Sequence, residues 1–344
     1  AAKMFEDRGI EVRVEPGLSA DKLIERIGEF DGLAVRSATK VTRDVLAAAG
    51  RLKVIGRAGI GVDNIDVAAA SARGVVVMNT PFGNSITTAE HAIGLMFAVA
   101  RDIPAADHST QSGKWEKSRF MGVELTGKTL GIIGCGNVGS IVADRALGLK
   151  MKVVAYDPYL QPDRAAALAI EKVAFDELLR RADFITLHTP LTDSTSGILN
   201  ATAFAQMKDG VRIVNCARGE LIVEADLVAA LTSGRVGGIG LDVYAEEPPP
   251  DTFSLFGLDH VVATPHLGAA TNEAQENVAL QVAEQMSDFL TTGAIVNAIN
   301  MASVSAEDAP RLMPFMRLAE LLGSLAGQIA ESSVTAVAME FEGE

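Results

Sequence analysis

Cysteine is scarce in this chain of 344 residues, and its scarcity limits the kinds of site the chain can build. The two cysteines, Cys135 and Cys216, form neither a CxxC motif nor a Cys/His pattern with metal-ligand spacing. Disulfide scaffolds and structural zinc sites need more cysteines in closer sets. We therefore expect no metal, and free thiols in a reducing compartment, the cytoplasm.

Long apolar runs are missing as well. The most apolar helical stretch, residues 92–100, is much shorter than the roughly 20 residues that span a membrane. The first residues include Lys3, Glu6 and Arg8, which do not fit a signal peptide. The sequence thus predicts a soluble protein with no membrane partner.

Positive charge is in deficit, with 30 Lys and Arg against 44 Asp and Glu and a formal net charge of −14. A negative field of this size repels nucleic acid and anionic membrane surfaces, so we expect neither as a partner. An anionic substrate or cofactor would need a local group of basic side chains. Arginines that lie close together are therefore candidates for a binding site.

The chain does contain a regular alternation of short, β-branched apolar runs and Ala/Leu-rich helical stretches. This alternation predicts βαβ units and parallel sheets covered on both faces. The predicted strands cover residues 32–35, 52–55, 75–78, 129–133, 152–156, 184–188, 211–215, 237–243 and 260–264. The predicted shorter helices include residues 20–30, 41–49, 140–147, 176–181 and 225–232.

Two longer helical patterns, residues 87–99 and 272–289, indicate connections between domains. The first opens with Thr87 and Glu90 at the spacing of a capping box, which predicts a helix start at Thr87.

The expected fold class is α/β, with two Rossmann-like domains, each a doubly wound parallel sheet. A nucleotide-binding domain of residues 83–268 would be inserted into a substrate-binding domain made of residues 1–82 and 269–299. Residues 300–344, with a helical run over 310–330, predict the start of a further C-terminal domain, for which regulation is one role.

A glycine-rich motif follows one predicted strand directly. Residues 129–139 read TLGIIGCGNVG, a strand that runs into GxGxxG with glycines at Gly134, Gly136 and Gly139 before a helix. Such glycines permit a tight turn, close approach of the backbone to a pyrophosphate, and close helix–strand packing. The next strand ends at Asp157, at the spacing where a carboxylate binds the adenosine ribose and disfavours a 2′-phosphate. The sequence therefore predicts an NAD site, against the simpler interpretation of a glycine-rich turn.

Three chemically useful side chains follow later strands. Arg218 comes after the strand 211–215, Glu247 after 237–243, and His266 after 260–264. The carboxyl ends of parallel strands meet at one sheet edge, where ligands bind. Histidine has an ordinary pKa of about 6.5 and suits a base that takes a hydroxyl proton. A neighbouring carboxylate would orient the ring and favour the imidazolium, and the arginine fork matches a substrate carboxylate.

Each of these residues also has a structural interpretation. Arg218 could be a surface or helix-start charge, and Glu247 could be a solvated loop carboxylate. His188, at the end of a strand, competes with His266 for the catalytic role, although the following Thr189-Pro190 resembles a turn that lines a cofactor. His91 and His108 lie on helical stretches, where a packing or surface role is the more frequent one.

Motifs across residues 31–300 resemble one family. They read VRSATKV at 35–41, GRAGIGVDNID at 56–66, MNTP at 78–81, GNS at 83–85, GKW at 113–115, NCARG at 215–219, LDV at 241–243 and PHLGA at 265–269. The chain resembles the D-isomer-specific 2-hydroxyacid dehydrogenases, and among these the members that oxidise 3-phospho-D-glycerate at the entry to serine synthesis.

The resemblance implies roles for particular residues. It assigns catalysis to Arg218, Glu247 and His266, in agreement with the strand-end analysis. It places at NAD-contacting positions Ile60, Asn137, Val138, Asp157, Thr189, Cys216 and Asp242, beside which Ala217 and Gly268 are also expected to lie. It places at substrate-binding positions Arg36, Ser37, Lys40, Arg57, Gly59 and Gly61.

The resemblance also implies a homo-oligomer, a dimer or tetramer, in which the segment around Trp115 crosses to a neighbouring subunit and brings Lys117 or Arg119 to its active site. Asn137 departs from the family pattern, which often has arginine there. Other substrates stay open at this point, namely glycerate or hydroxypyruvate and 2-hydroxyglutarate. An NAD-sensing corepressor-like protein is a further alternative, because relatives of this fold have that role. Arg36 and Lys40 favour a phosphorylated substrate.

Overall fold

The structure is a computed structural model that describes residues 1–305 and 307–329. The chain divides into two compact units. Unit 1 comprises Ala1–Gly83 and Glu276–Glu344, and unit 2 comprises Asn84–Gln275. Each unit is built around its own parallel sheet.

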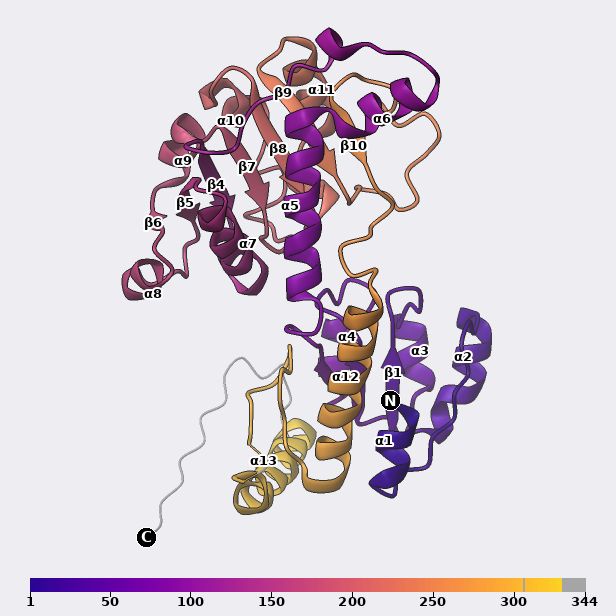
Figure 1. The fold of residues 1–344 in the computed structure, drawn as a ribbon. Helices are drawn as coiled ribbons and strands as arrows, with labels where there is room; N and C mark the ends of the chain where they lie inside the picture. Colours follow the sequence, from indigo (N-terminus) through magenta and orange to yellow (C-terminus); the bar gives the residue numbers. More distant parts are fainter. Residues whose placement is uncertain (306, 330–344) are drawn as a thin grey trace. The chain divides into compact units, whose positions relative to one another are not determined.

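The sheet of unit 1 has three parallel strands in the order β1-β2-β3 (Figure 1). Side-chain oxygens of Ser19, Thr42 and Asp66 accept backbone N–H groups at the starts of α2, α3 and α4. The strands are β1 (Gly32–Val35), β2 (Val54–Arg57) and β3 (Val76–Met78). The helices are α1 (Ala2–Asp7), α2 (Ala20–Arg26), α3 (Arg43–Ala48), α4 (Val67–Ala72), α12 (Asn272–Thr292) and α13 (Ala309–Ile329).

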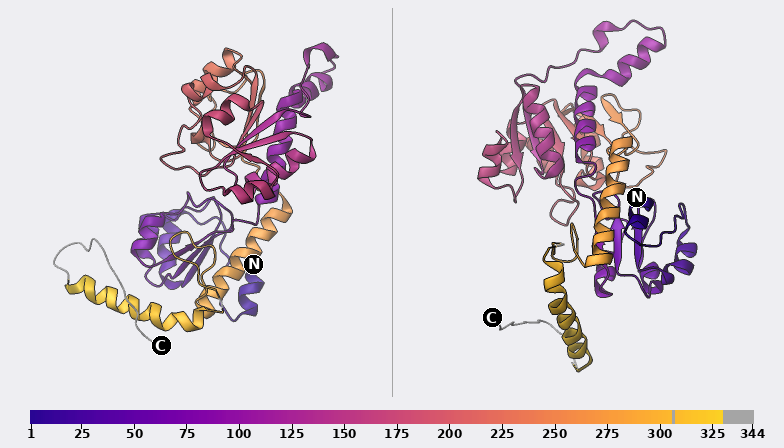
Figure 2. Two further views of the ribbon diagram at one scale, coloured as in Figure 1. Left: turned by 90° about the vertical axis from the view of Figure 1, so that its left-hand side faces the viewer. Right: turned by 60° about the horizontal axis from the view of Figure 1, so that its bottom comes forward.

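Helices cover both faces of this small sheet. On one face, Leu46 of α3 packs in a buried cluster with Ile55 of β2. On the other face, Val282 and Met286 of α12 pack in a cluster with Val54. The helix α12 runs beside the three strands in both views of Figure 2. The sheet is therefore doubly wound.

Gly56 explains how α12 comes so near to the sheet. A Cβ at this position would lie 2.3 Å from the Sδ atom of Met286 and 2.5 Å from Cγ2 of Val282. Only a residue without a side chain leaves room for both. The glycine thus sets the helix–sheet distance beneath the loop that follows β2.

The sheet of unit 2 has seven parallel strands in the order β10-β9-β8-β7-β4-β5-β6 (Figure 1). The winding reverses between β4 and β7, where an α/β sheet opens a crevice at its carboxyl edge. The strands are β4 (Thr129–Ile133), β5 (Lys152–Tyr156), β6 (Glu171–Lys172), β7 (Phe184–Leu187), β8 (Val211–Asn215), β9 (Val236–Leu241) and β10 (Val261–Ala263).

Two buried clusters hold helices on the two faces of this sheet. Leu95 of α5 and Val142 of α7 pack with Ile132 and Phe184 on one face. On the other face, a second cluster unites β-strand residues with Leu178, Phe204 and Leu227 of the helices α9, α10 and α11. The helices are α5 (Ser85–Arg101), α6 (Ile103–Gln111), α7 (Asn137–Gly148), α8 (Pro162–Ala167), α9 (Phe175–Arg181), α10 (Ala201–Gln206) and α11 (Glu224–Thr232).

The predicted start of the first long helix is wrong. The helix α5 begins at Ser85, two residues before Thr87, with Asn84 at the N-cap position. The hydroxyl of Thr88 donates to the carbonyl of Asn84 at 3.0 Å, whereas Thr87 meets the hydroxyl of Thr271 at 3.3 Å. The threonine–glutamate spacing that suggested a capping box therefore occurs inside the helix.

The later strands are also shorter than expected. Strand β9 ends at Leu241, so Asp242 and Val243 lie in the following loop. Strand β10 begins after His260, whose φ of 62° is left-handed and incompatible with an extended strand. Val243 is buried as a strand residue would be, which is why the apolar pattern overextends β9.

Among the described residues, no helix has the length and apolar character to cross a membrane. The helix α13 is nevertheless rich in exposed apolar side chains, and it can be followed in yellow in Figure 2. They include Leu312, Phe315, Leu318, Leu321, Leu322, Leu325 and Ile329.

Candidate functional site

The three glycines after β4 meet different surroundings. A Cβ at Gly134 would lie 2.7 Å from the backbone of His188 and Thr189, and its φ of 89° is left-handed. A Cβ at Gly139 would lie 2.1 Å from the carbonyl oxygen of Gly134. Gly136, which caps α7, has nothing within 4 Å of its Cβ position. Two glycines are thus required by the fold, and the middle one leaves open space above a helix N-terminus, as a bound pyrophosphate would need.

Asp157 lies directly beyond β5 and binds the glycine-rich turn. Its Oδ2 accepts the backbone N–H of Cys135 at 2.8 Å, and its Oδ1 accepts that of Tyr159 at 2.8 Å. Burial, with the negative charge of Asp157 nearby, raises the pKa of the Cys135 thiol to about 11. The carboxylate is therefore held in one orientation at the place where a dinucleotide-binding fold contacts the adenosine ribose.

The other predicted cofactor residues of unit 2 lie around the same sheet edge. Asn137 is exposed and Val138 half-buried at the start of α7, and Thr189 is half-buried in the loop after β7. Cys216 is buried just after β8, and the backbone N–H of Ala217 donates to Oδ1 of Asn215 at 3.0 Å. These positions follow β4, β7 and β8, neighbouring strands whose carboxyl ends lie at one edge of the sheet.

His266 and Glu247 are in direct contact. Nδ1 of His266 lies 2.7 Å from Oε2 of Glu247, and both side chains are more than one-third exposed. The other carboxylate oxygen of Glu247 accepts the backbone N–H of Tyr244 at 3.2 Å. With Nδ1 facing a carboxylate, the proton of a neutral ring resides on Nδ1, and Nε2 is the nitrogen able to accept a proton.

A close backbone contact joins the loop of Arg218 to the loop of Glu247. Arg218 follows β8, and its carbonyl accepts the side-chain amide of Asn215 at 2.8 Å. The next residue, Gly219, packs so tightly that its Cβ would lie 2.1 Å from the carbonyl carbon of Tyr244 and 2.2 Å from the nitrogen of Ala245. The loops that carry the guanidinium and the carboxylate therefore touch through their main chains.

Asp242 is a fully buried carboxylate that holds the loop of His266. Its Oδ2 accepts the N–H of Gly268 at 2.7 Å, and its Oδ1 accepts the N–H of Leu267 at 2.7 Å and the hydroxyl of Thr264 at 2.6 Å. Burial alone would raise the pKa of Asp242, but hydrogen bonds from His91, Thr264 and Leu267 hold it below its usual value. The donors described for this carboxylate are thus groups of the protein itself.

His91 was not among the candidate site residues, yet it joins this buried group. Its Nε2 lies 3.1 Å from Oδ1 of Asp242 and 3.2 Å from Oγ1 of Thr264. The expected packing or surface role did not include this contact with a buried carboxylate. His91 lies within α5 and follows no strand end, so the surrounding sequence carries no signal for this contact, which only the packing of α5 reveals.

His188 lies in a different environment from His266. Its Nε2 pairs with Oγ1 of the buried Thr186 at 2.8 Å, and burial lowers the pKa of His188 to about 4. A ring that resists protonation in this way is a poor proton acceptor. His266, by contrast, is 51% exposed and faces the carboxylate of Glu247.

One group of possible metal ligands occurs among the described residues. His91, Cys216 and Asp242 each place one ligand atom within 4.8 Å of the others. Burial, with the charge of Asp242, raises the pKa of the Cys216 thiol far above its usual value. A neutral thiol and a carboxylate already saturated with donors do not fit a metal centre.

In unit 1, two predicted substrate residues stand at the carboxyl ends of neighbouring strands. Arg36 follows β1, and Arg57 ends β2, where it is in register with Val35. The side-chain amide of Asn64 donates to the carbonyl of Arg36 at 3.1 Å. The Nη1 of Arg57 donates to the carbonyl of Ala58 at 2.8 Å. Two guanidinium groups therefore arise from one edge of this sheet.

The loop after β2 is held by residues that follow β3. The N–H of Gly59 donates to Oγ1 of Thr80 at 2.6 Å, and the side chain of Asn79 donates to the carbonyl of Ile60 at 2.6 Å. Gly59 has a φ of 139°, and a Cβ there would overlap the guanidinium of Arg57. Asn79 and Thr80 belong to the MNTP motif, but no role was predicted for them.

The remaining predicted residues of unit 1 are accessible. Ser37 and Lys40 are exposed in the loop after β1, and Ile60 and Gly61 are half-buried in the loop after β2. They lie in the two loops that also carry Arg36 and Arg57, which is where the resemblance puts the substrate.

The glycine-rich turn, the switch in strand order and the histidine–glutamate pair define a dinucleotide-binding protein equipped for proton transfer. The family model of the D-isomer specific 2-hydroxyacid dehydrogenase NAD-binding domain matches residues 93–268. The chain belongs to this family. A nicotinamide dinucleotide is accordingly its cofactor.

Similar proteins carry related names. The chain is 48% identical over 318 residues to a D-3-phosphoglycerate dehydrogenase of Archaeoglobus fulgidus, which covers 92% of this chain and 60% of that protein. It is 47% identical over 345 residues to one of Methanocaldococcus jannaschii, covering 100% of this chain and 66% of that protein. The chain therefore spans about 60 to 66% of the length of these relatives.

Solved structures share the fold. A glyoxylate reductase from Paecilomyes thermophila superposes with a TM-score of 0.80 at 32% identity, covering 87% of this chain and 94% of that one. The apo-structure of D-lactate dehydrogenase from Escherichia coli gives a TM-score of 0.75 at 30% identity, covering 86% and 96%. The expected α/β fold with Rossmann-like parallel sheets is confirmed.

Proposed function

We propose that this chain catalyses the oxidation of 3-phospho-D-glycerate to 3-phosphohydroxypyruvate with NAD, the first step of the phosphorylated route to L-serine. The motifs that resemble members acting on this substrate support the proposal. The names of the relatives at 48% and 47% identity support it as well.

The observation that carries the proposal is the 2.7 Å contact between Nδ1 of His266 and Oε2 of Glu247. In the direction of oxidation, Nε2 of His266 accepts the proton of the C2 hydroxyl group. The resulting imidazolium is stabilised by the carboxylate of Glu247, which also holds the plane of the ring. In the direction of reduction, the same nitrogen returns the proton to the C2 oxygen.

Arg218 provides the positive charge for this chemistry. A guanidinium donates two parallel hydrogen bonds to a carboxylate, so Arg218 would bind the C1 carboxylate and polarise the C2 oxygen. The dinucleotide, when bound, supplies the hydride acceptor at its nicotinamide ring. The protein groups have the separate task of moving the proton and orienting the substrate.

We propose NAD rather than NADP as the cofactor. Asp157 stands at the end of β5 with its carboxylate fixed by the N–H groups of Cys135 and Tyr159. A negative charge at this position attracts ribose hydroxyls as donors and repels a 2′-phosphate.

The phosphate of the substrate would be bound by cations of unit 1. The exposed side chains of Arg36 and Lys40 lie in one loop, and Arg57 stands at the end of the neighbouring strand. In a chain of net charge −14, such a group of cations is suited to a substrate with two anionic ends. Ser37 and the backbone N–H groups of Ile60 and Gly61 would supply further donors, while Gly59 shapes the turn that presents them.

A substrate panel tests the proposal. Reduction of phosphohydroxypyruvate, hydroxypyruvate, glyoxylate, pyruvate and 2-oxoglutarate is followed with NADH and with NADPH on the purified chain. We expect kcat/KM to be highest for phosphohydroxypyruvate with NADH, by about 100-fold over hydroxypyruvate, since one phosphate contributes several charge-assisted hydrogen bonds. Equal kcat/KM for phosphohydroxypyruvate and hydroxypyruvate would indicate that the substrate is a different 2-hydroxy acid. NADH binding without turnover of any substrate would support a sensor protein instead.

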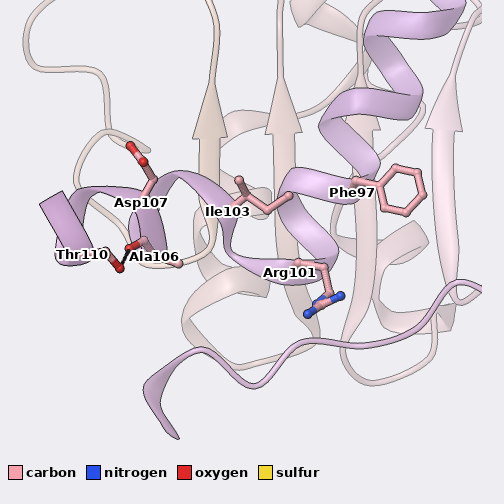
Figure 3. Close-up of a pocket in the computed structure, with 6 residues that line it drawn as sticks. All are labelled: Phe97, Arg101, Ile103, Ala106, Asp107 and Thr110. Carbon is pink, nitrogen blue, oxygen red and sulfur yellow. Dashed lines mark hydrogen bonds between the residues drawn. The ribbon is translucent and has the colours of Figure 1, made fainter. Parts of the chain in front are cut away.

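We further propose a homo-oligomer whose interface includes the junction of α5 and α6. Figure 3 shows the depression at this junction, with Phe97 and Ile103 beside it. Phe97 is 37% and Ile103 50% exposed, and farther along Trp115 is 85% exposed. A subunit interface would cover these apolar side chains, and a second copy is the partner that the family resemblance implies. A monomer in light scattering at micromolar concentration would contradict this.

The proposed location is the cytoplasm. Both cysteines are buried and free, which accords with a reducing compartment.

A further inference from the structure

The loop that carries His266 is fastened at both of its ends to one carboxylate. Before His266, Thr264 donates its hydroxyl to Oδ1 of Asp242 at 2.6 Å. After His266, Leu267 and Gly268 donate their backbone N–H groups to Oδ1 and Oδ2 of Asp242, each at 2.7 Å. The position of the imidazole therefore depends on the orientation of a side chain that it does not touch.

His266 itself requires this support. Its φ is 54°, in the left-handed region, which costs about 1 kcal/mol or more for a residue other than glycine. Its side chain is 51% exposed, so packing contributes little to holding it. The hydrogen bonds on either side of the residue are what keep this backbone conformation populated.

His91 adds a contact to the same oxygen of Asp242. Its Nε2 lies 3.1 Å from Oδ1 of Asp242 and 3.2 Å from Oγ1 of Thr264. Since the Thr264 hydroxyl already donates to Oδ1, the remaining donor in this triangle is the Nε2–H group of His91. His91 extends from the middle of α5, a helix of 17 residues whose neighbouring Ala92 and Leu95 are buried in the core.

We propose that His91 is a positioning residue for the catalytic base: through Asp242 and Thr264 it holds the loop 264–268 so that His266 presents Nε2 to the substrate. The inference rests on the proposed function, because it assigns His266 as the base. It adds a residue from a helix in the core, distant in sequence from every catalytic loop.

The same three groups could be taken for a metal site, since Cys216 lies within 4.8 Å of His91 and Asp242. The carboxylate already accepts two backbone N–H groups and one hydroxyl, which leaves it coordinatively satisfied. The thiol stays protonated in these buried surroundings, because burial raises the pKa of Cys216. Hydrogen bonding from His91 explains the geometry without an ion.

Two variants at one position separate positioning from packing. His91→Gln keeps a donor near the place of Nε2 on a side chain that is compatible with a helix, whereas His91→Leu keeps the bulk and removes the donor. His260→Asn is the matched control. It alters a histidine–aspartate pair of similar length, 2.9 Å from Nδ1 to Oδ1 of Asp102, and asparagine tolerates the left-handed φ of 62° there.

Kinetics give the first readout. We expect His91→Leu to lower kcat for phosphohydroxypyruvate reduction by about tenfold, in line with the loss of one hydrogen bond to a buried carboxylate. The KM for NADH should change less than about twofold, because the glycine-rich turn is untouched. His91→Gln should recover most of kcat, and His260→Asn should match the parent chain.

Amide hydrogen exchange gives a second readout that does not need activity. The N–H groups of Leu267 and Gly268 should exchange faster in His91→Leu than in the parent chain, and His91→Gln should restore their protection. Unchanged exchange and unchanged kcat in His91→Leu would overturn the inference, as would one equivalent of zinc in the purified parent chain. A parent chain that reduces no 2-oxo acid would instead contradict the proposed function, with the exchange result still reporting on the loop.

Discussion

Gly139 lies so close to Gly134 that a Cβ at position 139 would be 2.1 Å from the carbonyl oxygen of Gly134. This contact joins the first turn of α7 to the end of β4. Gly136, between them, has open space around its Cβ position and a φ of −77°, which any residue adopts. The motif therefore combines two glycines that the fold requires with a third, Gly136, that leaves space for a bound pyrophosphate.

Substitutions at these glycines should affect different properties, stability at Gly139 and NADH binding at Gly136. Gly139→Ala forces a methyl group against backbone and should lower the free energy of unfolding by about 1–3 kcal/mol. Gly136→Val should leave thermal stability near that of the parent chain while it weakens NADH binding by at least about tenfold, because the side chain would occupy the space of the pyrophosphate. Thermal unfolding and fluorescence titration with NADH measure the two effects. Tight NADH binding by Gly136→Val would show that the dinucleotide does not cross this turn.

Removing the base should stop turnover without loss of the cofactor. We expect His266→Ala to reduce kcat by at least about 100-fold, with the Kd for NADH within about twofold of the parent value. Glu247→Gln keeps the shape of the partner and removes its charge, so kcat should fall by about tenfold through a less stabilised imidazolium. Stopped-flow absorbance at 340 nm measures the hydride step. Turnover by His266→Ala at the parent rate would assign the proton transfer elsewhere.

Asp157 should determine the choice of dinucleotide. Asp157→Asn retains an acceptor for the N–H of Cys135 and removes the negative charge. The ratio of kcat/KM for NADH to that for NADPH should fall by about tenfold, as the repulsion of the 2′-phosphate is lost. Asp144→Asn, which removes an exposed carboxylate from helix α7, controls for charge in general. An unchanged ratio in Asp157→Asn would remove the carboxylate from the ribose site.

His188 should make stability depend on pH below neutrality. Its pKa is about 4 in the folded chain, whereas histidine in an unfolded chain titrates near 6.5. Between these values the unfolded state binds more protons, so the free energy of unfolding falls as pH decreases from 6.5 to 4, by at most about 3 kcal/mol. His188→Gln should flatten this dependence in urea unfolding measured at several pH values. An equally steep profile in the variant would attribute the acid sensitivity to other groups.

The cations of unit 1 should distinguish phosphorylated from plain substrates. Arg36→Ala should raise the KM for phosphohydroxypyruvate by about tenfold and leave the KM for hydroxypyruvate nearly unchanged. Only phosphohydroxypyruvate has a phosphate that the arginine would bind. Arg43→Ala, an exposed arginine on the nearby helix α3, is the matched control. Equal changes for the two substrates would place Arg36 at the shared carboxylate.

Much of the fold could be predicted because parallel strands buried on both faces are continuous apolar runs. Residues 129–133, 152–156 and 211–215 are strands with the expected bounds. The start of α5 could not be predicted, since Asn84 caps the helix without a side-chain hydrogen bond, and the threonines after it satisfy the capping pattern by chance. Local sequence predicts a helix start only where the side chain of the N-cap residue accepts a backbone hydrogen bond.

For the site, position after a strand was the informative signal. It pointed to the loops of Arg218, Glu247 and His266, whose catalytic roles stay predictions. It could not reveal His91, because a helix residue meets Asp242 only through the packing of α5 on β8 and β9. Position after a strand also does not tell whether a carboxylate is exposed or buried. Asp242 is buried, with 0% exposure.

Gly219 allows the loop after β8 and the loop after β9 to approach each other closely. With no side chain, it lets the main chain after Arg218 rest on that of Tyr244 and Ala245. Any larger residue would push the loop that carries Arg218 away from the loop that carries Glu247, even with every reactive group intact. Mutational searches for new substrates should therefore keep Gly219 fixed, because a larger residue there would displace both loops at once.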